Sequence, residues 1–145
     1  MLDCKLNKIF ENKTLETKKF KLKSNQEFNS FYPNEFIGVE SKEDGLIFSV
    51  KVGHSLVKDS YIKYVLTCDK SLNCEANKIT QLVQHSKNLK KEKLEISPQV
   101  QGIVVLEGPR EIIRLIQKKD GEFNLTYVMA WVNGSLSGRE LDCHE

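Results

Sequence analysis

The sequence predicts a single α+β domain, in which a β-meander is followed by a β-α-β-α-β half with two helices on one face of the sheet. The chain has 145 residues, a common size for one domain. Apolar residues alternate strictly in parts of the first half, which is typical of half-buried strands. In two segments of the second half they recur at helical spacing. No repeat, low-complexity tract or Pro/Gly linker interrupts residues 1–145, so we expect one domain.

The N-terminal segment, residues 1–23, is rich in lysine and is expected to form an arm or edge strands. Ser24 and Glu27 then fit a helix capping box, in which each side chain satisfies a backbone N–H of the first turn. Phe28 and Phe31 follow at helical spacing, and Pro33 ends this helix after about two turns. The segment therefore predicts a short N-terminal helix.

The meander is predicted over residues 36–68. A first strand at 36–40 leads into the turn 42–45, where Asp-Gly supplies the turn chemistry. Strands at 46–52 and 61–68 follow, each with one apolar face. The apolar sets are Leu46, Phe48, Val50 and Val52 in the first of these, and Ile62, Tyr64, Leu66 and Cys68 in the second.

Helices and strands are expected to alternate in the second half. Residues 75–91 are predicted as a helix whose apolar arc is formed by Ile79, Leu82, Val83 and Leu89. A buried strand follows at 100–107, then a helix that opens at Gly108-Pro109 and closes at Gly121, with Ile112, Ile113, Leu115 and Ile116 as its apolar set. A strand at 123–132 precedes a polar tail, 134–145. The expected core joins Trp131, Met129, Leu106 and Ile112.

Catalytic and metal-binding motifs are not recognisable. Gly53-His54-Ser55 with nearby Asp59 lacks the G-x-S-x-G pattern of a nucleophile elbow, and we interpret it as a solvated loop. Cys68, Cys74 and His85 lack the usual spacing of zinc ligands. We therefore predict no catalytic residue, no metal and no cofactor.

The charge pattern leaves a nucleic-acid partner as an alternative. The formal net charge is +2, and 19 lysines stand against 3 arginines, although arginine is the residue that best reads bases and grips phosphate. A lysine cluster, Lys87, Lys90, Lys91 and Lys93, lies at the end of the predicted helix 75–91. Its charges would project into water, where they could displace the counterions of a polyanion.

The four cysteines permit two interpretations. The preferred one is four reduced thiols in an intracellular protein, because the first residues lack the layout of a secretory signal. The alternative is a secreted protein with two bridges in one of three connectivities. This alternative is consistent with three N-x-S/T triplets, the acceptor pattern for N-glycosylation, which begin at Asn12, Asn124 and Asn133. Asn124 falls within a predicted strand, which is a poor position for a glycan.

Residues 99–120 resemble the strand–turn–helix of several ferredoxin-like domains. The nearest fit in order and spacing is the small domain that follows the RWD module in RWD-containing proteins. The stretch is also similar to the C-terminal domain of a spliceosomal pre-mRNA-processing factor that binds small nuclear RNA. Residues 61–94 loosely match the preceding strand and helix of that domain, and residues 31–36 resemble the end of the first RWD helix. The resemblance implies a ferredoxin-like sandwich and hardly any function.

Together these observations predict a non-enzymatic protein–protein interaction module within an intracellular complex, with exposed apolar residues such as Phe31 at its interface. An RNA-binding domain that uses Lys87, Lys90, Lys91 and Lys93 is the first alternative, and a secreted, disulfide-linked binding protein is the second. No membrane partner is expected, because the longest apolar run is far shorter than a bilayer span.

Overall fold

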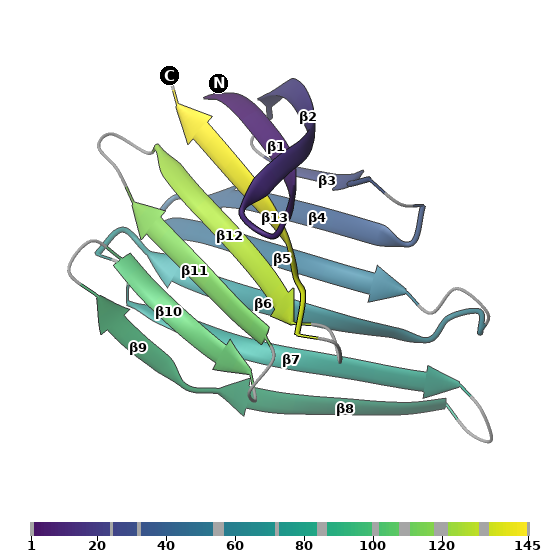
Figure 1. Ribbon diagram of the computed structural model, residues 1–145. Coiled ribbons are helices and arrows are strands. Elements are labelled where there is room, and N and C mark those ends of the chain that lie inside the picture. The colour runs from purple at the N-terminus through teal and green to yellow at the C-terminus, as the bar shows by residue number, and fades with distance from the viewer. Residues whose placement is uncertain are drawn as a thin grey trace. The chain divides into compact units, whose positions relative to one another are not determined.

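The computed structural model describes residues 2–23, 25–31, 33–53, 57–71, 73–83, 87–99, 102–107, 111–117, 122–130 and 134–144. Every helix or strand within these ranges is a β-strand (Figure 1). The predicted α+β class and the ferredoxin-like sandwich are therefore wrong, and the protein is all-β, with two antiparallel sheets. In the described ranges no helix is long and apolar enough to cross a membrane. The chain divides into two compact units, residues 1–23 with 95–145, and residues 24–94.

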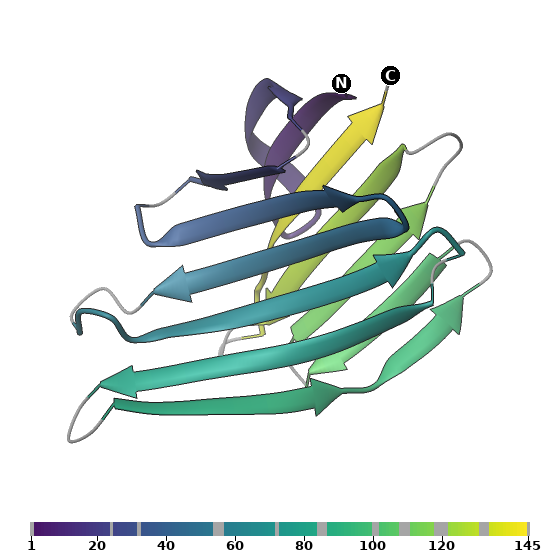
Figure 2. The same cartoon turned by 180° about the vertical axis from the view of Figure 1, so that it is seen from behind.

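The first unit is a seven-stranded sheet that brings the two ends of the chain together. Its strands in spatial order are β2 (Lys13–Leu22), β1 (Leu2–Phe10), β13 (Leu136–His144), β12 (Phe123–Ala130), β11 (Glu111–Gln117), β10 (Gly102–Glu107) and β9 (Ile96–Gln99). Asp3 pairs with His144, and the two termini lie side by side (Figures 1 and 2). The C-terminal residues are thus no peripheral tail: they form an inner strand in which Leu141 and Cys143 are buried.

The second unit is a six-stranded meander in which each strand pairs with the next along the chain (Figure 2). Its strands are β3 (Asn25–Asn29), β4 (Glu35–Lys42), β5 (Gly45–Gly53), β6 (Tyr61–Asp69), β7 (Cys74–Val83) and β8 (Lys87–Leu94). The predicted meander is confirmed as β4, β5 and β6, with its turn at residues 43–44. The expected inward faces are also correct, since Phe48, Val50, Tyr64, Leu66 and Cys68 are buried.

Each of the three predicted helices is replaced by strands. The N-terminal helix is β3, the helix at 75–91 is the β7–β8 hairpin, and the helix after Pro109 is β11. In the hairpin, Ile79 is half-buried while Leu82 and Leu89 are exposed. These residues of the predicted apolar arc therefore do not form one buried face. In β11 the adjacent apolar residues lie on opposite faces of a strand. Spacings of three and four residues arise in both cases without a helix.

The predicted core is wrong at Ile112, whose side chain is 43% exposed. Because side chains alternate along β11, Ile113 and Leu115 occupy the buried face and Ile112 the other. The side chains of Leu106 and Met129, and all of Trp131, lie outside the described residues.

All four cysteines are paired, which corrects the expectation of reduced thiols. Cys4 is bonded to Cys143, and Cys68 to Cys74. In each bridge the two cysteines are direct partners in the register of neighbouring antiparallel strands, with Cα–Cα distances of 4.2 and 4.1 Å. Directly opposite residues of antiparallel strands approach this closely only at pairs that exchange no backbone hydrogen bond. The strand register therefore selects this connectivity among the three that four cysteines allow.

Candidate binding face of the six-stranded sheet

The six-stranded sheet has one buried and one exposed face, because side chains alternate along its strands. The buried face carries Ile37, Val39, Phe48, Val50, Tyr64, Leu66, Cys68, Ala76 and Leu94. The opposite face carries side chains that are exposed or half-exposed, many of them charged. We call this second face the open face.

Lysines of three strands align across the open face. Lys51 on β5 is opposite Lys63 on β6, Lys63 is opposite Ile79 on β7, and Ile79 is opposite Lys91 on β8. Lys93 follows Lys91 two residues along the same strand and points to the same face. We call these four lysines the cationic row. Like charges directly opposite each other on neighbouring strands destabilise a sheet, so Lys51 and Lys63 do not stabilise the fold by pairing.

The Lys51 ammonium is positioned by two aromatic rings of the same face. Its Nζ lies 4.6 Å from the centroid of the Tyr61 ring and 5.6 Å from that of Phe36. Both distances are within the range of a cation–π interaction. Phe36 is the direct cross-strand partner of Lys51, and Tyr61 is a diagonal neighbour on β6. The aromatic rings therefore hold the charge at one end of the row in place without neutralising it.

The remaining lysines of the row are not neutralised either. In the part of the chain that the structure describes, Lys63, Lys91 and Lys93 form no ion pair with a carboxylate. Among the carboxylates of the open face, Glu40, Glu75 and Asp69 lie further along the strands, toward the Cys68–Cys74 bridge. Glu27 on β3 is opposite Gly38, at the edge of the sheet away from Lys91 and Lys93. The open face is thus basic at the row and acidic near that bridge.

Of the four lysines predicted as a binding cluster, those whose side chains are described do not all lie on one face. Lys91 and Lys93 belong to the cationic row, whereas Lys90 occupies the alternate position on β8 and points to the other face. Its Nζ lies 2.6 Å from Glu92 Oε1. This hydrogen bond raises the pKa of Lys90 and lowers the pKa of Glu92. Lys87 begins β8, and its side chain lies outside the description.

The structure describes only some of the other residues considered as candidates for a site. Phe31 is half-buried in the turn between β3 and β4. His54, Ser55 and His85 lie outside the described residues. Cys68 and Cys74, considered as zinc ligands, are bonded to each other and have no thiolate to offer. The described residues hold no group of three or more His, Cys, Asp or Glu that could bind a metal ion.

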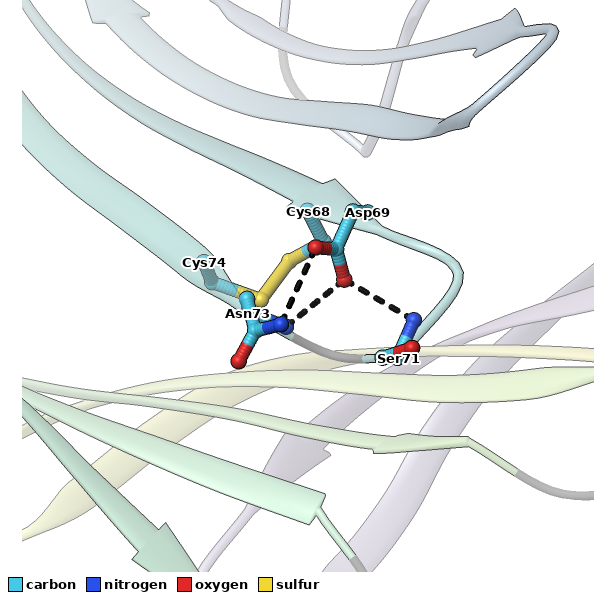
Figure 3. Close-up of a disulfide and its surroundings, with 5 residues drawn as sticks. All are labelled: Cys68, Asp69, Ser71, Asn73 and Cys74. Carbon is cyan, nitrogen blue, oxygen red and sulfur yellow. Dashed lines mark hydrogen bonds between the residues drawn. A yellow bond between two sulfur atoms is a disulfide. The ribbon is translucent and has the colours of Figure 1, made fainter.

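The turn beside the Cys68–Cys74 bridge is ordered by Asp69 (Figure 3). Its Oδ1 accepts the backbone N–H of Ser71 at 2.8 Å and that of Asn73 at 2.9 Å, and its Oδ2 accepts the Asn73 side-chain amide at 3.1 Å. The bonds from Asn73 and Ser71 stabilise the carboxylate and lower the pKa of Asp69. Asp69 therefore stabilises the turn between β6 and β7, and the Cys68–Cys74 bridge cross-links the same hairpin.

Comparison with known proteins identifies no relative. No family model, no curated protein and no solved structure matches this chain significantly. With the ferredoxin-like fold overturned, nothing is carried over from the resemblance of residues 99–120.

Sequence reasoning missed Lys51, Lys63, Phe36 and Tyr61. The signal was present, because Lys51 and Lys63 occupy the polar positions of two strands that the alternation predicts correctly. Their alignment with each other depends on the register in which β5 and β6 pair, which the predicted strand boundaries do not fix. Their alignment with Lys91 required β7 and β8 to be recognised as strands.

Proposed function

We propose that the protein is a non-enzymatic binding domain of an oxidising compartment, which binds a linear sulfated polysaccharide along the cationic row. The observation that carries this proposal is the alignment of Lys51, Lys63 and Lys91 in one register row of the open face. Neighbouring strands are about 4.8 Å apart, so the row spans about 14 Å across three strand steps. A chain with regularly spaced anionic groups matches this geometry.

The charges favour an anion that is bound through electrostatics and not through bidentate hydrogen bonds. Lysine presents a compact point charge, whereas arginine presents a planar fork suited to reading bases or phosphates. An anion laid over Lys51 and Lys63 would relieve their mutual repulsion, which the fold itself leaves uncompensated. Binding would therefore release counterions and depend steeply on salt.

The disulfides favour a sulfated polysaccharide over RNA as the partner. Disulfides persist in the secretory pathway and outside the cell, and they are rare in the reducing cytosol and nucleus. All four cysteines are paired here. This supports the secreted, disulfide-linked binding protein over an intracellular interaction module or an RNA-binding domain.

Heparin is the probe for the test, with affinity measured over a series of salt concentrations. The triple variant K63Q/K91Q/K93Q should flatten the log–log salt slope by about two units, if heparin follows the value of about 0.7 per neutralised charge that holds for single-stranded nucleic acids. The matched control is K13Q/K42Q/K70Q, which removes the same charge from exposed lysines that are not cross-strand partners of another lysine. The control should leave the slope unchanged, and neither triple should alter folding much, because exposed lysines contribute little stability.

Three results would contradict the proposal. Equal flattening by both triples would mean that heparin responds to net charge alone. Tighter binding of single-stranded RNA than of heparin in the same buffer would indicate the RNA-binding alternative. Tighter binding of polyglutamate would indicate an acidic protein as the partner.

A further inference from the structure

The three N-x-S/T triplets lie in different structural settings. Asn12 is the second central residue of the two-residue turn that joins β1 to β2, with Phe10 and Lys13 paired on either side. Glu11 and Asn12 have φ angles of 48° and 64°, as a type I′ hairpin turn requires, and asparagine tolerates this conformation well. Asn12, Lys13 and Thr14 are all exposed. The complete triplet is thus presented at the tip of a hairpin.

The triplet at Asn124 is held within the sheet. Asn124 lies on β12 between β11 and β13, and its Nδ2 donates to Asp142 Oδ1 at 3.3 Å. Thr126 Oγ1 donates to Asn124 Oδ1 at 3.0 Å. A glycan on Nδ2 would have to be accommodated beside the bonds that Asn124 makes with Asp142 and Thr126. The third triplet begins at Asn133, which lies outside the described residues.

The turn that carries Asn12 is anchored by a neighbour and not by the triplet itself. The backbone N–H of Glu11 donates to Leu136 O at 3.0 Å, and the backbone N–H of Leu136 donates to Glu11 Oε1 at 2.9 Å. Both bonds leave the Asn12 amide and the Thr14 hydroxyl uninvolved. A substituent on Asn12 would therefore leave the hairpin tip intact.

The same end of the sheet exposes apolar side chains. Phe10, Leu15 and Leu136 are 40%, 56% and 39% exposed, and they flank Asn12 in the sequence or pair beside its turn. Phe10 is paired with Ser137, so Leu136 points to the other face of the sheet. The exposure of these side chains on both faces shows that the tip around Asn12 is open to solvent.

We propose that Asn12 is an N-glycosylation site. The co-substrate is an oligosaccharide linked to a lipid diphosphate, supplied with the transferase of the secretory pathway. Nδ2 of Asn12 attacks the anomeric carbon, the new C–N bond forms, and the bond from that carbon to the phosphate oxygen breaks. The lipid diphosphate departs with the bonding electrons, and one amide proton is lost to a base. The proposal shares with the proposed function only the oxidising compartment and does not involve the cationic row.

The test is translation of the full chain, fused to a cleavable secretion signal, in the presence of microsomes from the endoplasmic reticulum. Transfer to Asn12 is expected to retard the chain in electrophoresis by one glycan, and endoglycosidase should reverse the shift. N12Q and T14A should abolish this shift, and the matched variant T14S, which keeps the triplet, should retain it. N124Q should leave the shift at Asn12 unchanged.

Glycopeptide mapping of the same product decides the outcome. Occupied Asn12 supports the proposal, whereas translocated chain with unmodified Asn12 overturns it, whatever is found at Asn124 or Asn133. Because the glycan is added before folding is complete, a variant that folds poorly still gives an answer. Heparin binding is measured separately through Lys63, Lys91 and Lys93, so failure of one proposal is distinguishable from failure of the other.

Discussion

Removal of the Cys4–Cys143 bridge should destabilise the protein far more than removal of the Cys68–Cys74 bridge. The first bridge joins residues 139 positions apart, and the second joins residues 6 positions apart. A cross-link stabilises a fold mainly by restricting the unfolded chain, and the restriction grows with the length of the closed loop. The perturbation compared is therefore C4A/C143A against C68A/C74A.

The chain-entropy relation gives a stabilisation of about 5 kcal/mol for the long loop and about 2 kcal/mol for the short one at 25 °C. Both variants lose sulfur atoms from mostly buried positions, since Cys4, Cys143 and Cys68 are buried. Packing losses therefore largely cancel in the comparison. We expect a difference of about 3 kcal/mol in the free energy of unfolding.

Urea denaturation at 25 °C, followed by circular dichroism, measures both variants against the parent protein. The slope with urea should rise in the variants, because a chain without the cross-link exposes more surface when it unfolds. Equal losses in the two variants, or a larger loss in C68A/C74A, would refute this reasoning about loop length.

Three further variants test individual contacts. Asp69→Asn should destabilise the hairpin turn near neutral pH. Folding lowers the pKa of Asp69 below its ordinary value of 3.8, so the carboxylate stabilises the fold above that value and this stabilisation is lost as pH falls through the folded pKa. The unfolding curves of the parent and the variant should therefore converge in acid. Gly45→Ala should lower the free energy of unfolding by about 3 kcal/mol or more, because its Cβ would lie 1.8 Å from the Cys68 carbonyl oxygen. The control Gly53→Ala, whose nearest contact would be 3.5 Å, should lower it much less. Similar losses in thermal or urea unfolding would contradict this prediction. Tyr61→Leu should weaken heparin binding by a few-fold, because it removes about 0.5–1 kcal/mol of cation–π interaction with Lys51. Unchanged affinity in titration calorimetry would show that the rings do not position that charge.

Strict alternation predicts β5, β6 and β12 correctly, and the strands predicted at 36–40 and 100–107 correspond to β4 and β10. Phe48 and Val50 on β5, and Tyr64 and Leu66 on β6, are separated by polar or half-exposed residues, and only a strand places such pairs on one face. Phe123, Leu125 and Tyr127 on β12 follow the same rule and are buried. In these segments a local pattern is sufficient, because the period of two excludes a helix.

The predicted helices fail because apolar residues on both faces of a strand imitate helical spacing. Ile112, Ile113, Leu115 and Ile116 recur at intervals of three and four, but Ile113 and Leu115 alone are buried. Short apolar runs of this kind are ambiguous in periodicity, and here the density of β-branched residues was the better guide. Ser24 and Glu27 likewise match a capping box by spacing alone, since Glu27 lies within the five-residue strand β3.

The disulfides and the cationic row could not be predicted, since both depend on register between strands. Cys4 meets Cys143 only because the N- and C-terminal strands pair, a contact across 139 positions that no local pattern encodes. Cys68 and Cys74 would have been recognised as opposite residues had β7 been identified as the partner of β6. Because β7 was predicted as part of a helix, the alignment of Lys63 with Lys91 across β7 could not be predicted either.

Disulfide mapping of the native protein is the most direct test of the account. The protein is alkylated without reduction and digested, and its cross-linked peptides are identified by mass spectrometry. We expect two linkages, Cys4–Cys143 and Cys68–Cys74, because each joins direct partners in the register of a different sheet. Four alkylated thiols would contradict the oxidising compartment on which the proposed function depends. A bridge from Cys4 or Cys143 to Cys68 or Cys74 would contradict the strand pairing.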